Sequence, residues 1–417
     1  MPGGRWRARA LRRVAEAASL HGSGLEITNR ANLQIRGLTP DAHRLLVREL
    51  VGAGVALADA GADARRNVLA SPTAGADPGE VTDTRALVSE VAAALAGASA
   101  LSAKFGVLVD GGGRTHVRGR PHDICLGAVQ RRDGSVAYQV RLAAALPAAV
   151  HVRSSRLVDP DDAPDLVAGA LELIADRADA KGRTAGVVAA LGEHEALRQA
   201  AARRGVSLTT VAADEVRPLP QPSVRPIGVL PQRQDGLSMV GAMPVLGRLA
   251  AAQCSAVAAV ATDHSVSADG AEVRLTPWRS VLIPDVPAEK AGAALAELEA
   301  LDLAVDPSDP ALSVVACAGS SGCPASYTDT QRDGRAVVAA LRACSAGSFS
   351  VHLSGCAKRC ADGSTNFDVT LVGGPTPDAY AVAGHPEAGS PSAGDAVRVE
   401  AAAVAEHVAS MARVDPA

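Results

Sequence analysis

Apolar residues recur along the chain in two spacings, one typical of helices and one typical of strands. Residues 162–179 and 183–205 are rich in Ala and Leu, with apolar positions three or four apart, and this spacing predicts helices. Residues 27–38, ITNRANLQIRGL, alternate apolar and polar positions, which predicts a half-buried strand. Because helical and strand-like stretches alternate throughout, the pattern predicts an α+β or α/β fold.

The same pattern occurs twice, in the same order. Residues 275–286, LTPWRSVLIPDV, match residues 27–38 without a gap, and residues 314–330 match residues 68–84 so that the tripeptide Thr-Asp-Thr coincides. Ala-rich stretches that begin at Gly4 and Gly247 predict a helix before each strand segment. We therefore expect two related halves packed about a pseudo-twofold axis.

The repeats divide the chain into four segments. Each half begins with a helix–strand unit and continues with a strand–loop–helix–strand unit. A Pro-rich run at 217–232 joins the halves and is predicted to be an extended linker. The predicted domains are residues 1–60, 61–216, 217–305 (with the linker) and 306–417.

Composition excludes several functional classes. The 417 residues have a formal net charge of −4, and only 2% of them are aromatic, so a generally basic nucleic-acid binder with stacking platforms is excluded. No apolar stretch is long enough to cross a membrane, and no signal-peptide core follows the basic N-terminus. We expect a cytoplasmic protein, in which the seven cysteines stay reduced.

Four cysteines form two spaced pairs in the second half. The pairs are Cys317-x5-Cys323 and Cys356-x3-Cys360, and each follows a predicted strand. Inert buried thiols are one interpretation and structural zinc is another, although five intervening residues are unusual for zinc. An iron–sulfur cluster fits best, because four thiolates bind a [4Fe–4S] cluster. Cys125, Cys254 and Cys344 stand alone and are assigned to the core or the surface.

These motifs together resemble a known family. The two cysteine pairs, the stretch TNRANLQIRG and the duplication are similar to the nitrite/sulfite reductase superfamily, and SGCAKRCA and AKFGVLVDGGG are similar to its precorrin-3B synthase branch. The resemblance implies an α+β fold with two ferredoxin-like half-domains and two cluster- and tetrapyrrole-binding α/β domains about a pseudo-twofold axis. It also implies a [4Fe–4S] cluster on the four paired cysteines.

The branch implies a reaction and its partners. Its members are oxygen-dependent monooxygenases that convert precorrin-3A to precorrin-3B, with hydroxylation at C20 and closure of a γ-lactone, in aerobic cobalamin biosynthesis. The resemblance further implies a non-haem iron and an electron donor, a reduced nicotinamide acting through a reductase or a ferredoxin. No nucleic acid or membrane is expected as a partner.

A polycarboxylate substrate needs fixed cations, and Arg forks bind carboxylates in a bidentate manner. The resemblance implies tetrapyrrole contacts from Arg30 in the T-x-R motif, Arg66 before Asn-Val, Lys104 in the K-F motif, and Arg36. Arg30 and Arg36 are expected to alternate on one strand, where solvation is the alternative role.

Two alternative functions stay open. A sirohaem-dependent nitrite or sulfite reductase would use the same cluster ligands and basic pocket, but it is disfavoured by Gly106, where sulfite reductases more often have a second Lys. A non-catalytic iron–sulfur protein that binds a tetrapyrrole is the other. No catalytic residue is selected, since the spacing of His116, His122 and His352 does not distinguish iron ligands from ordinary histidines.

Overall fold

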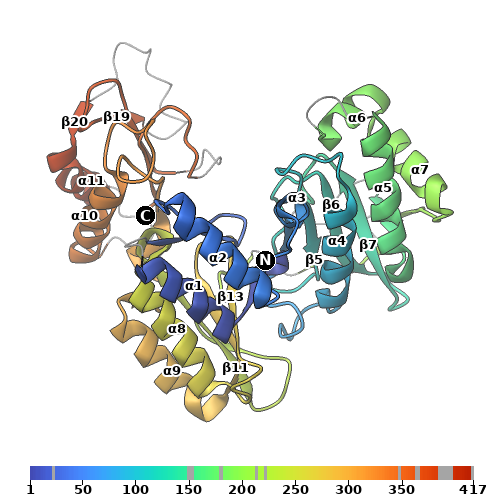
Figure 1. Cartoon of the computed structure of the whole chain (residues 1–417), viewed down its shortest axis with the longest axis horizontal. Coiled ribbons are helices and arrows are strands. Elements are labelled where there is room, and N and C mark those ends of the chain that lie inside the picture. Colours follow the sequence, from blue (N-terminus) through green and yellow to red (C-terminus); the bar gives the residue numbers. More distant parts are fainter. Residues whose placement is uncertain are drawn as a thin grey trace.

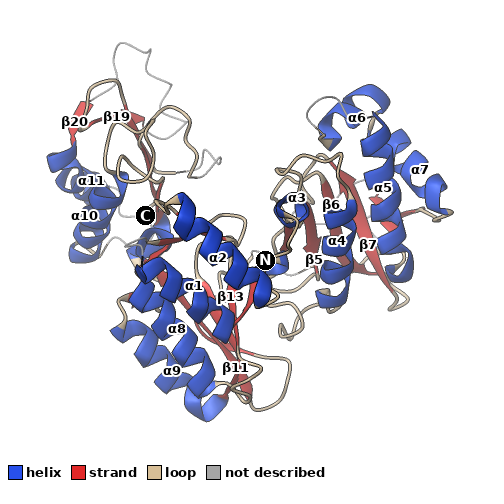
Figure 2. Cartoon of the chain, in the orientation of Figure 1, coloured by secondary structure: helices blue, strands red, loops and turns tan. Residues whose placement is uncertain are grey.

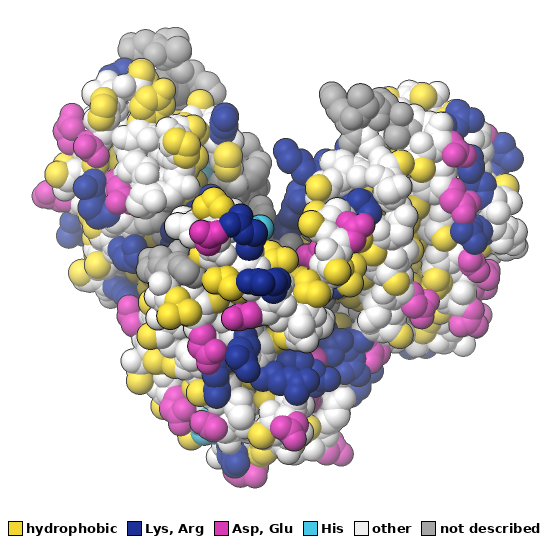
Figure 3. All heavy atoms as spheres, viewed as in Figure 1, with side chains coloured by type: hydrophobic (Ala, Val, Ile, Leu, Met, Phe, Trp, Pro, Cys, Tyr) yellow, Lys and Arg dark blue, Asp and Glu magenta, His cyan; other side chains and the backbone are white. Residues whose placement is uncertain are grey.

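The computed structural model describes residues 1–20, 24–147, 155–177, 182–211, 215–219, 223–345, 349–361, 367–383 and 398–414. The chain forms a central lobe and two outer lobes, which Figure 1 shows above it on either side. Figure 3 shows a hollow between the outer lobes, with the central lobe as its floor. None of the helices in the described ranges has the length and apolar character that crossing a bilayer requires.

The central lobe combines segments from both halves. One sheet has the strand order β1-β13-β14-β11-β10, with β15 paired to β11, and a smaller sheet has the order β12-β2-β3. The strands are β1 (Arg5–Arg7), β2 (Leu25–Ile27), β3 (Leu33–Ile35), β10 (Gly228–Pro231), β11 (Leu237–Pro244), β12 (Arg248–Leu249), β13 (Glu272–Leu275), β14 (Val281–Pro287) and β15 (Leu303–Ala304). The helices are α1 (Ala8–Leu20), α2 (Pro40–Gly52), α8 (Ala251–His264) and α9 (Ala288–Ala300).

Each half lends one short strand to the other half. Strand β1 pairs with β13 of the second half, with Trp6 opposite Val273, and β12 pairs with β2 of the first half, with Leu249 opposite Leu25. Both pairings are antiparallel, and all four of these apolar residues are buried. The reciprocal exchange relates the halves by a pseudo-twofold axis and merges them into one core.

The helices expected from Gly4 and Gly247 begin later than predicted, at Ala8 and Ala251. The intervening residues form the exchanged strands, because pairing across the axis satisfies backbone groups that a longer helix would have used. Gly4 is required here, since its φ is +69 and a Cβ at Gly4 would lie 2.4 Å from the Leu275 carbonyl oxygen.

The first outer lobe has a six-stranded sheet in the order β4-β5-β6-β7-β8-β9, with helices packed against it (Figure 2). The strands are β4 (Val68–Ala70), β5 (Val107–Asp110), β6 (Ile124–Gln130), β7 (Val136–Leu142), β8 (Ser155–Val158) and β9 (Thr209–Val211). The helices are α3 (Ala60–Arg65), α4 (Arg85–Gly97), α5 (Ala163–Arg177), α6 (Thr184–Leu191) and α7 (Glu193–Arg204). The helix expected over 183–205 is thus divided, because Gly192 has a φ of +79.

The second outer lobe repeats this arrangement. Its sheet order is β16-β17-β18-β19-β20, and in both lobes two parallel pairings are followed by antiparallel ones. The strands are β16 (Val314–Ala316), β17 (Val351–Ser354), β18 (Val369–Gly373), β19 (Ala379–Ala383) and β20 (Arg398–Glu400), with helices α10 (Thr330–Ala343) and α11 (Val404–Val414). The duplicated α+β fold is confirmed. The predicted linker at 217–232, however, ends in strand β10, which pairs with β11.

Helices α1 and α8 pack together near the pseudo-twofold axis, and Leu11 of α1 is only 1% exposed in their shared core. We expect Leu11→Ala to lower the free energy of unfolding by about 2–5 kcal/mol, because the cavity left there cannot fully collapse. Leu20, at 82% exposed on the same helix, is the matched control. A chemical denaturation series in which both variants unfold alike would contradict the role of this interface.

Candidate functional site

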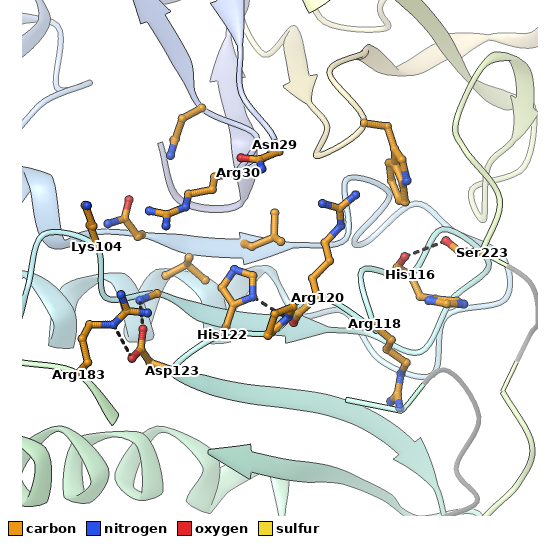
Figure 4. A pocket seen from close by; sticks show the side chains of 18 residues that line it. Asn29, Arg30, Lys104, His116, Arg118, Arg120, His122, Asp123, Arg183 and Ser223 are labelled. Carbon is orange, nitrogen blue, oxygen red and sulfur yellow. Dashed lines mark hydrogen bonds and ion pairs between the residues drawn. The ribbon is translucent and has the colours of Figure 1, made fainter. Parts of the chain in front are cut away.

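A cavity of about 720 Å³ opens between the central lobe and the first outer lobe (Figure 4). Its wall includes the β2–β3 turn, the start of β4, Lys104 and Gly106, and the loop 116–123 before β6. Arg183, Ser223 and Trp278 in the β13–β14 turn complete the described lining. Both halves of the chain therefore contribute to one cavity.

The cavity is strongly basic. Its described lining contains one carboxylate, Asp123, and five cationic side chains, which are Arg30, Lys104, Arg118, Arg120 and Arg183. Asp123 accepts a hydrogen bond from Arg183 Nε at 2.8 Å and others from the backbone N–H groups of Thr184 and Gly106. This carboxylate is consequently satisfied by the protein itself.

The cations differ in their own partners. Arg118 forms a fully buried ion pair with Asp110 at 3.2 Å, so its charge is compensated within the lobe. By contrast, the side chains of Arg30 and Lys104 are exposed to the cavity and make no hydrogen bond or ion pair with the part of the chain that the structure describes. These two donors are available to an anionic ligand.

Two histidines add neutral polar groups to the wall. Burial lowers the pKa of His116, and burial followed by the nearby Arg30 lowers the pKa of His122. Both shifts favour the neutral form of the ring. The Nδ1–H of His122 donates to the Arg120 carbonyl oxygen at 3.2 Å, since a carbonyl only accepts, and this leaves Nε2 as an acceptor. In Figure 4 His122 stands in the middle of the wall, between Arg183 and Arg118.

Trp278 occupies the position in the second half that Arg30 occupies in the first half. It is partly buried, and the Arg120 guanidinium carbon lies 5.7 Å from the centroid of its ring. The pseudo-twofold axis thus places a cation and an aromatic side chain in equivalent turns on the same cavity. A ligand with a flat apolar body and acidic substituents would meet both kinds of contact.

The structure brings together only two of the four predicted tetrapyrrole contacts. Arg30 and Lys104 line the cavity, although Arg30 lies in the β2–β3 turn and not on a strand. Arg66 points elsewhere and donates to the Val55 carbonyl oxygen and to Asp63. Arg36 lies beyond β3, pairs with Glu26 at 3.1 Å and donates to a backbone carbonyl of the second outer lobe.

The paired cysteines lie on two loops at the carboxyl ends of adjacent parallel strands. Cys317 directly follows β16, and Cys356 follows β17, which pairs with β16 in parallel. The Gly355 N–H donates to Cys317 Sγ at 3.2 Å, and the Tyr327 N–H donates to the Gly355 carbonyl oxygen at 2.8 Å. These contacts hold the two loops side by side.

The donor set fits an iron–sulfur cluster. All four thiols are free and at least partly accessible, and a backbone N–H already donates to one sulfur, the kind of hydrogen bond that tunes the potential of such clusters. Among the described residues, no three His, Cys, Asp or Glu side chains are grouped closely enough to share a single metal ion. A [4Fe–4S] cluster does not need such a group, since each thiolate binds a separate iron.

Family models and individual proteins match this chain. The model described as nitrite/sulfite reductase ferredoxin-like half domain matches residues 1–53 and 230–301. The chain is also 31% identical, over 87% of its length and 74% of the relative, to a precorrin-3B synthase of a Sinorhizobium species.

The chain belongs to the nitrite and sulfite reductase family.

A second family model and another relative agree with this membership, and a solved structure shows the same fold. A second model of the family, described as nitrite and sulphite reductase 4Fe-4S domain, matches residues 61–208, which is the copy that lacks the cysteine pairs. A ferredoxin–nitrite reductase of Synechococcus elongatus is 26% identical over 89% of the chain and 75% of the relative. The solved structure of the Mycobacterium tuberculosis NirA protein has the same fold, with a TM-score of 0.77 at 20% identity, over 99% of this chain and 79% of that one.

Several lining residues escaped the sequence analysis. Arg118 and Arg120 lie in the run HVRGRPHD, where basic residues alternate directly before the buried strand β6, and His122 of the same run was named without an assigned role. That alternation was a signal for an anion-binding loop. Arg183 and Trp278 had no comparable signal, because they reach the cavity from distant segments.

In the first outer lobe, a buried carboxylate joins the loops that correspond to the cysteine loops. In this lobe Ser71 and Asp77 occupy the positions of Cys317 and Cys323. Asp77 is 2% exposed and accepts hydrogen bonds from the backbone N–H groups of Gly79, Arg114 and Thr115. It thereby connects the loop after β4 to the loop after β5, which carries much of the cavity wall.

A second carboxylate, Glu80, is buried beside this loop. Its two oxygens accept from the Gly75 N–H, and Arg233 lies 3.7 Å away. Burial raises the pKa of Glu80 from 4.5 to about 7. Ionisation is thus unfavourable in the folded chain, so stability present at low pH is lost as the pH rises from about 4.5 through 7.

We expect Glu80→Gln to remove this dependence. Relative to the wild type, the variant gains free energy of unfolding between about pH 5 and pH 8, because a neutral amide carries no ionisation cost there. Denaturation curves at each pH measure the difference, with the exposed Glu90→Gln as the control. A difference that stays constant over this range would contradict the buried, proton-binding state of Glu80.

Proposed function

We propose that the chain is a precorrin-3B synthase, an oxygen-dependent monooxygenase that hydroxylates precorrin-3A at C20 and closes a γ-lactone in aerobic cobalamin biosynthesis. The observation that carries the proposal is the basic cavity, in which Arg30 and Lys104 have no partners in the described chain. Precorrins carry many acetate and propionate groups, which such donors bind. The Sinorhizobium relative bears the corresponding name.

The region around Gly106 favours this function over anion reduction. A Cβ at Gly106 would lie 3.2 Å from His122 Cδ2, so a larger side chain here requires the His122 ring to shift. A second Lys, which sulfite reductases more often have here, would displace this neutral ring. A cavity wall with Gly106 and His122 is thus suited to a large ligand that brings its own carboxylates.

Cys317, Cys323, Cys356 and Cys360 would hold the [4Fe–4S] cluster. When bound, the cluster would supply one-electron transfer. Its electrons would come from a reduced nicotinamide through a reductase, or from a ferredoxin. Arg30 and Lys104 would bind substrate carboxylates, and Trp278 would cover part of the apolar macrocycle. We assign no ligands to a non-haem iron, because the described residues gather no three suitable side chains.

A sirohaem-dependent nitrite or sulfite reductase is the second candidate, favoured by the 26% identity to the Synechococcus elongatus nitrite reductase.

The experiment that separates the synthase from the reductase is an absorption spectrum of protein purified without oxygen, with iron and acid-labile sulfide assays. Cluster absorption without haem bands, followed by incorporation of one labelled oxygen atom from dioxygen into precorrin-3A, is the expected result. Sirohaem bands would select the reductase instead. A cluster protein that binds precorrin-3A without converting it would be the non-catalytic alternative.

The cluster assignment predicts that Cys356→Ser abolishes the acid-labile sulfide of the purified protein, because one of four thiolate ligands is lost. Cys344→Ser is the matched control, since Cys344 lies at the end of α10 outside both loops. Iron and sulfide content per chain is the measurement. Unchanged sulfide in Cys356→Ser would remove this residue from the ligand set.

The pocket assignment predicts that Arg30→Ala weakens binding of precorrin-3A by about 1.5–3 kcal/mol, the loss of one charge-assisted contact. Arg44→Ala, an exposed residue of α2 outside the cavity, should leave the dissociation constant unchanged. A fluorescence titration measures both, because Trp278 lines the cavity. Arg66→Ala tests the remaining family-implied contact, and equal weakening by Arg66→Ala and Arg30→Ala would contradict the arrangement described here.

A further inference from the structure

The turn between β13 and β14 lines the basic cavity and also contacts the cysteine loops. Trp278 of this turn lines the cavity. Its neighbour, Arg279, is 8% exposed and points into the second outer lobe. Arg279 Nη1 donates to the Ala316 carbonyl oxygen at 3.2 Å, and Nη2 donates to the Ala361 carbonyl oxygen. Ala316 directly precedes Cys317, and Ala361 directly follows Cys360.

One guanidinium therefore spans the first and the last of the four paired cysteines. Because a guanidinium is planar, rigid and permanently charged, it can hold two carbonyls in a fixed relation, which a lysine cannot do. The backbone of the turn supports this position, since the Arg279 N–H donates to the Thr276 carbonyl oxygen at 2.9 Å. Gly247 makes room for the side chain, because a Cβ there would lie 2.7 Å from Arg279 Cβ.

Two further arginines of the central lobe donate to the loop that carries the first cysteine pair, Cys317 and Cys323. Arg248 donates to the Ala318 carbonyl oxygen and Arg36 donates to the Gly322 carbonyl oxygen, each at 3.4 Å. Both acceptors lie close to the paired cysteines in sequence, between Cys317 and Cys323. Three cationic side chains thus reach the cysteine loops from one side.

The copy that lacks the cysteine pairs shows that this arginine contact is not a general requirement of the fold. The residue equivalent to Arg279 is Ala31, and both have a left-handed φ, of +65 and +56 respectively. Backbone conformation therefore does not explain the arginine. In the first outer lobe Asp77 joins the two loops, whereas in the second lobe the guanidinium of Arg279 joins them.

We propose that Arg279 is the positioning residue of the iron–sulfur cluster, which ties the two cysteine loops together and raises the reduction potential of the cluster through its charge. A cluster with four thiolate ligands is anionic, and a nearby buried cation favours the state with one more electron. Since Trp278 is the adjacent residue, the same turn also links the cluster loops to the tetrapyrrole cavity. This inference rests on the cluster assigned under the proposed function.

The test compares wild-type protein, Arg279→Met and Arg279→Lys, all full-length and purified without oxygen. Sulfide and iron content per chain reports how well the loops hold the cluster, and a redox titration followed by electron paramagnetic resonance reports its midpoint potential. Arg279→Met should lose sulfide faster under a chelator and titrate at a more negative potential. Arg279→Lys should lose sulfide faster as well but keep a potential near that of the wild type, because it keeps the charge without the fork.

Arg342→Met is the matched control. It also removes one arginine charge, but Arg342 lies in the last turn of α10 in the second outer lobe and pairs with Asp309 at 2.9 Å. Asp309 precedes β16, whereas Cys317 follows it. Its sulfide content and potential should match the wild type. If Arg279→Met does not fold, Arg279→Lys still tests the spanning role through its sulfide loss.

The outcomes separate this inference from the proposed function. Wild-type sulfide retention and potential in Arg279→Met, or equal shifts in Arg342→Met, would overturn the role of Arg279 and leave the cluster in place. Wild-type retention in Arg279→Lys would overturn the spanning role. Wild-type protein without iron and sulfide would overturn the cluster assignment, and this inference with it.

Discussion

The reciprocal exchange of the strands β1 and β12 is the constraint on which the rest of the structure depends. Each strand pairs with the opposite half, so neither half can complete its sheet alone. The exchange brings α1 against α8 and fixes the two hairpin turns relative to the outer lobes. As a result, Arg30 and Trp278, which lie in equivalent turns, reach one cavity from two halves of the chain. The cavity is therefore a product of the pseudo-symmetry.

The two outer lobes share a topology but differ in how they hold the same pair of loops. In the first lobe the carboxylate of Asp77 accepts backbone N–H groups from both loops, and a buried anion serves as the joint. In the second lobe the guanidinium of Arg279 donates to backbone carbonyls of both loops, and a buried cation serves instead. The opposite charges of Asp77 and Arg279 are consistent with the proposed chemistry, because only the second lobe carries the thiolates that would hold an anionic cluster.

The sequence predicted the architecture well where the signal was periodic or repeated. The gapless matches between the halves located the equivalent strands, and the α+β class followed from alternating helical and strand-like stretches. The short exchanged strands were missed, and the helices were expected to begin at Gly4 and Gly247, because a three-residue strand that pairs across the molecule leaves no local pattern. The split at Gly192 was missed for a similar reason, since an Ala-rich helix tolerates one Gly without losing its periodicity.

For the site, the sequence by itself determined the kinds of chemistry present. It gave four cysteines in spaced pairs and basic residues in recognisable motifs, and Arg30 and Lys104 do line the cavity. Only the tertiary structure decided which cations share a surface. It placed Arg66 on the Val55 carbonyl and Arg36 on the loop between Cys317 and Cys323, and it added Arg183 and Trp278 from remote segments. The physical reason is that residue type and spacing set what a side chain can bind, whereas its direction depends on strand pairing between segments far apart in the chain.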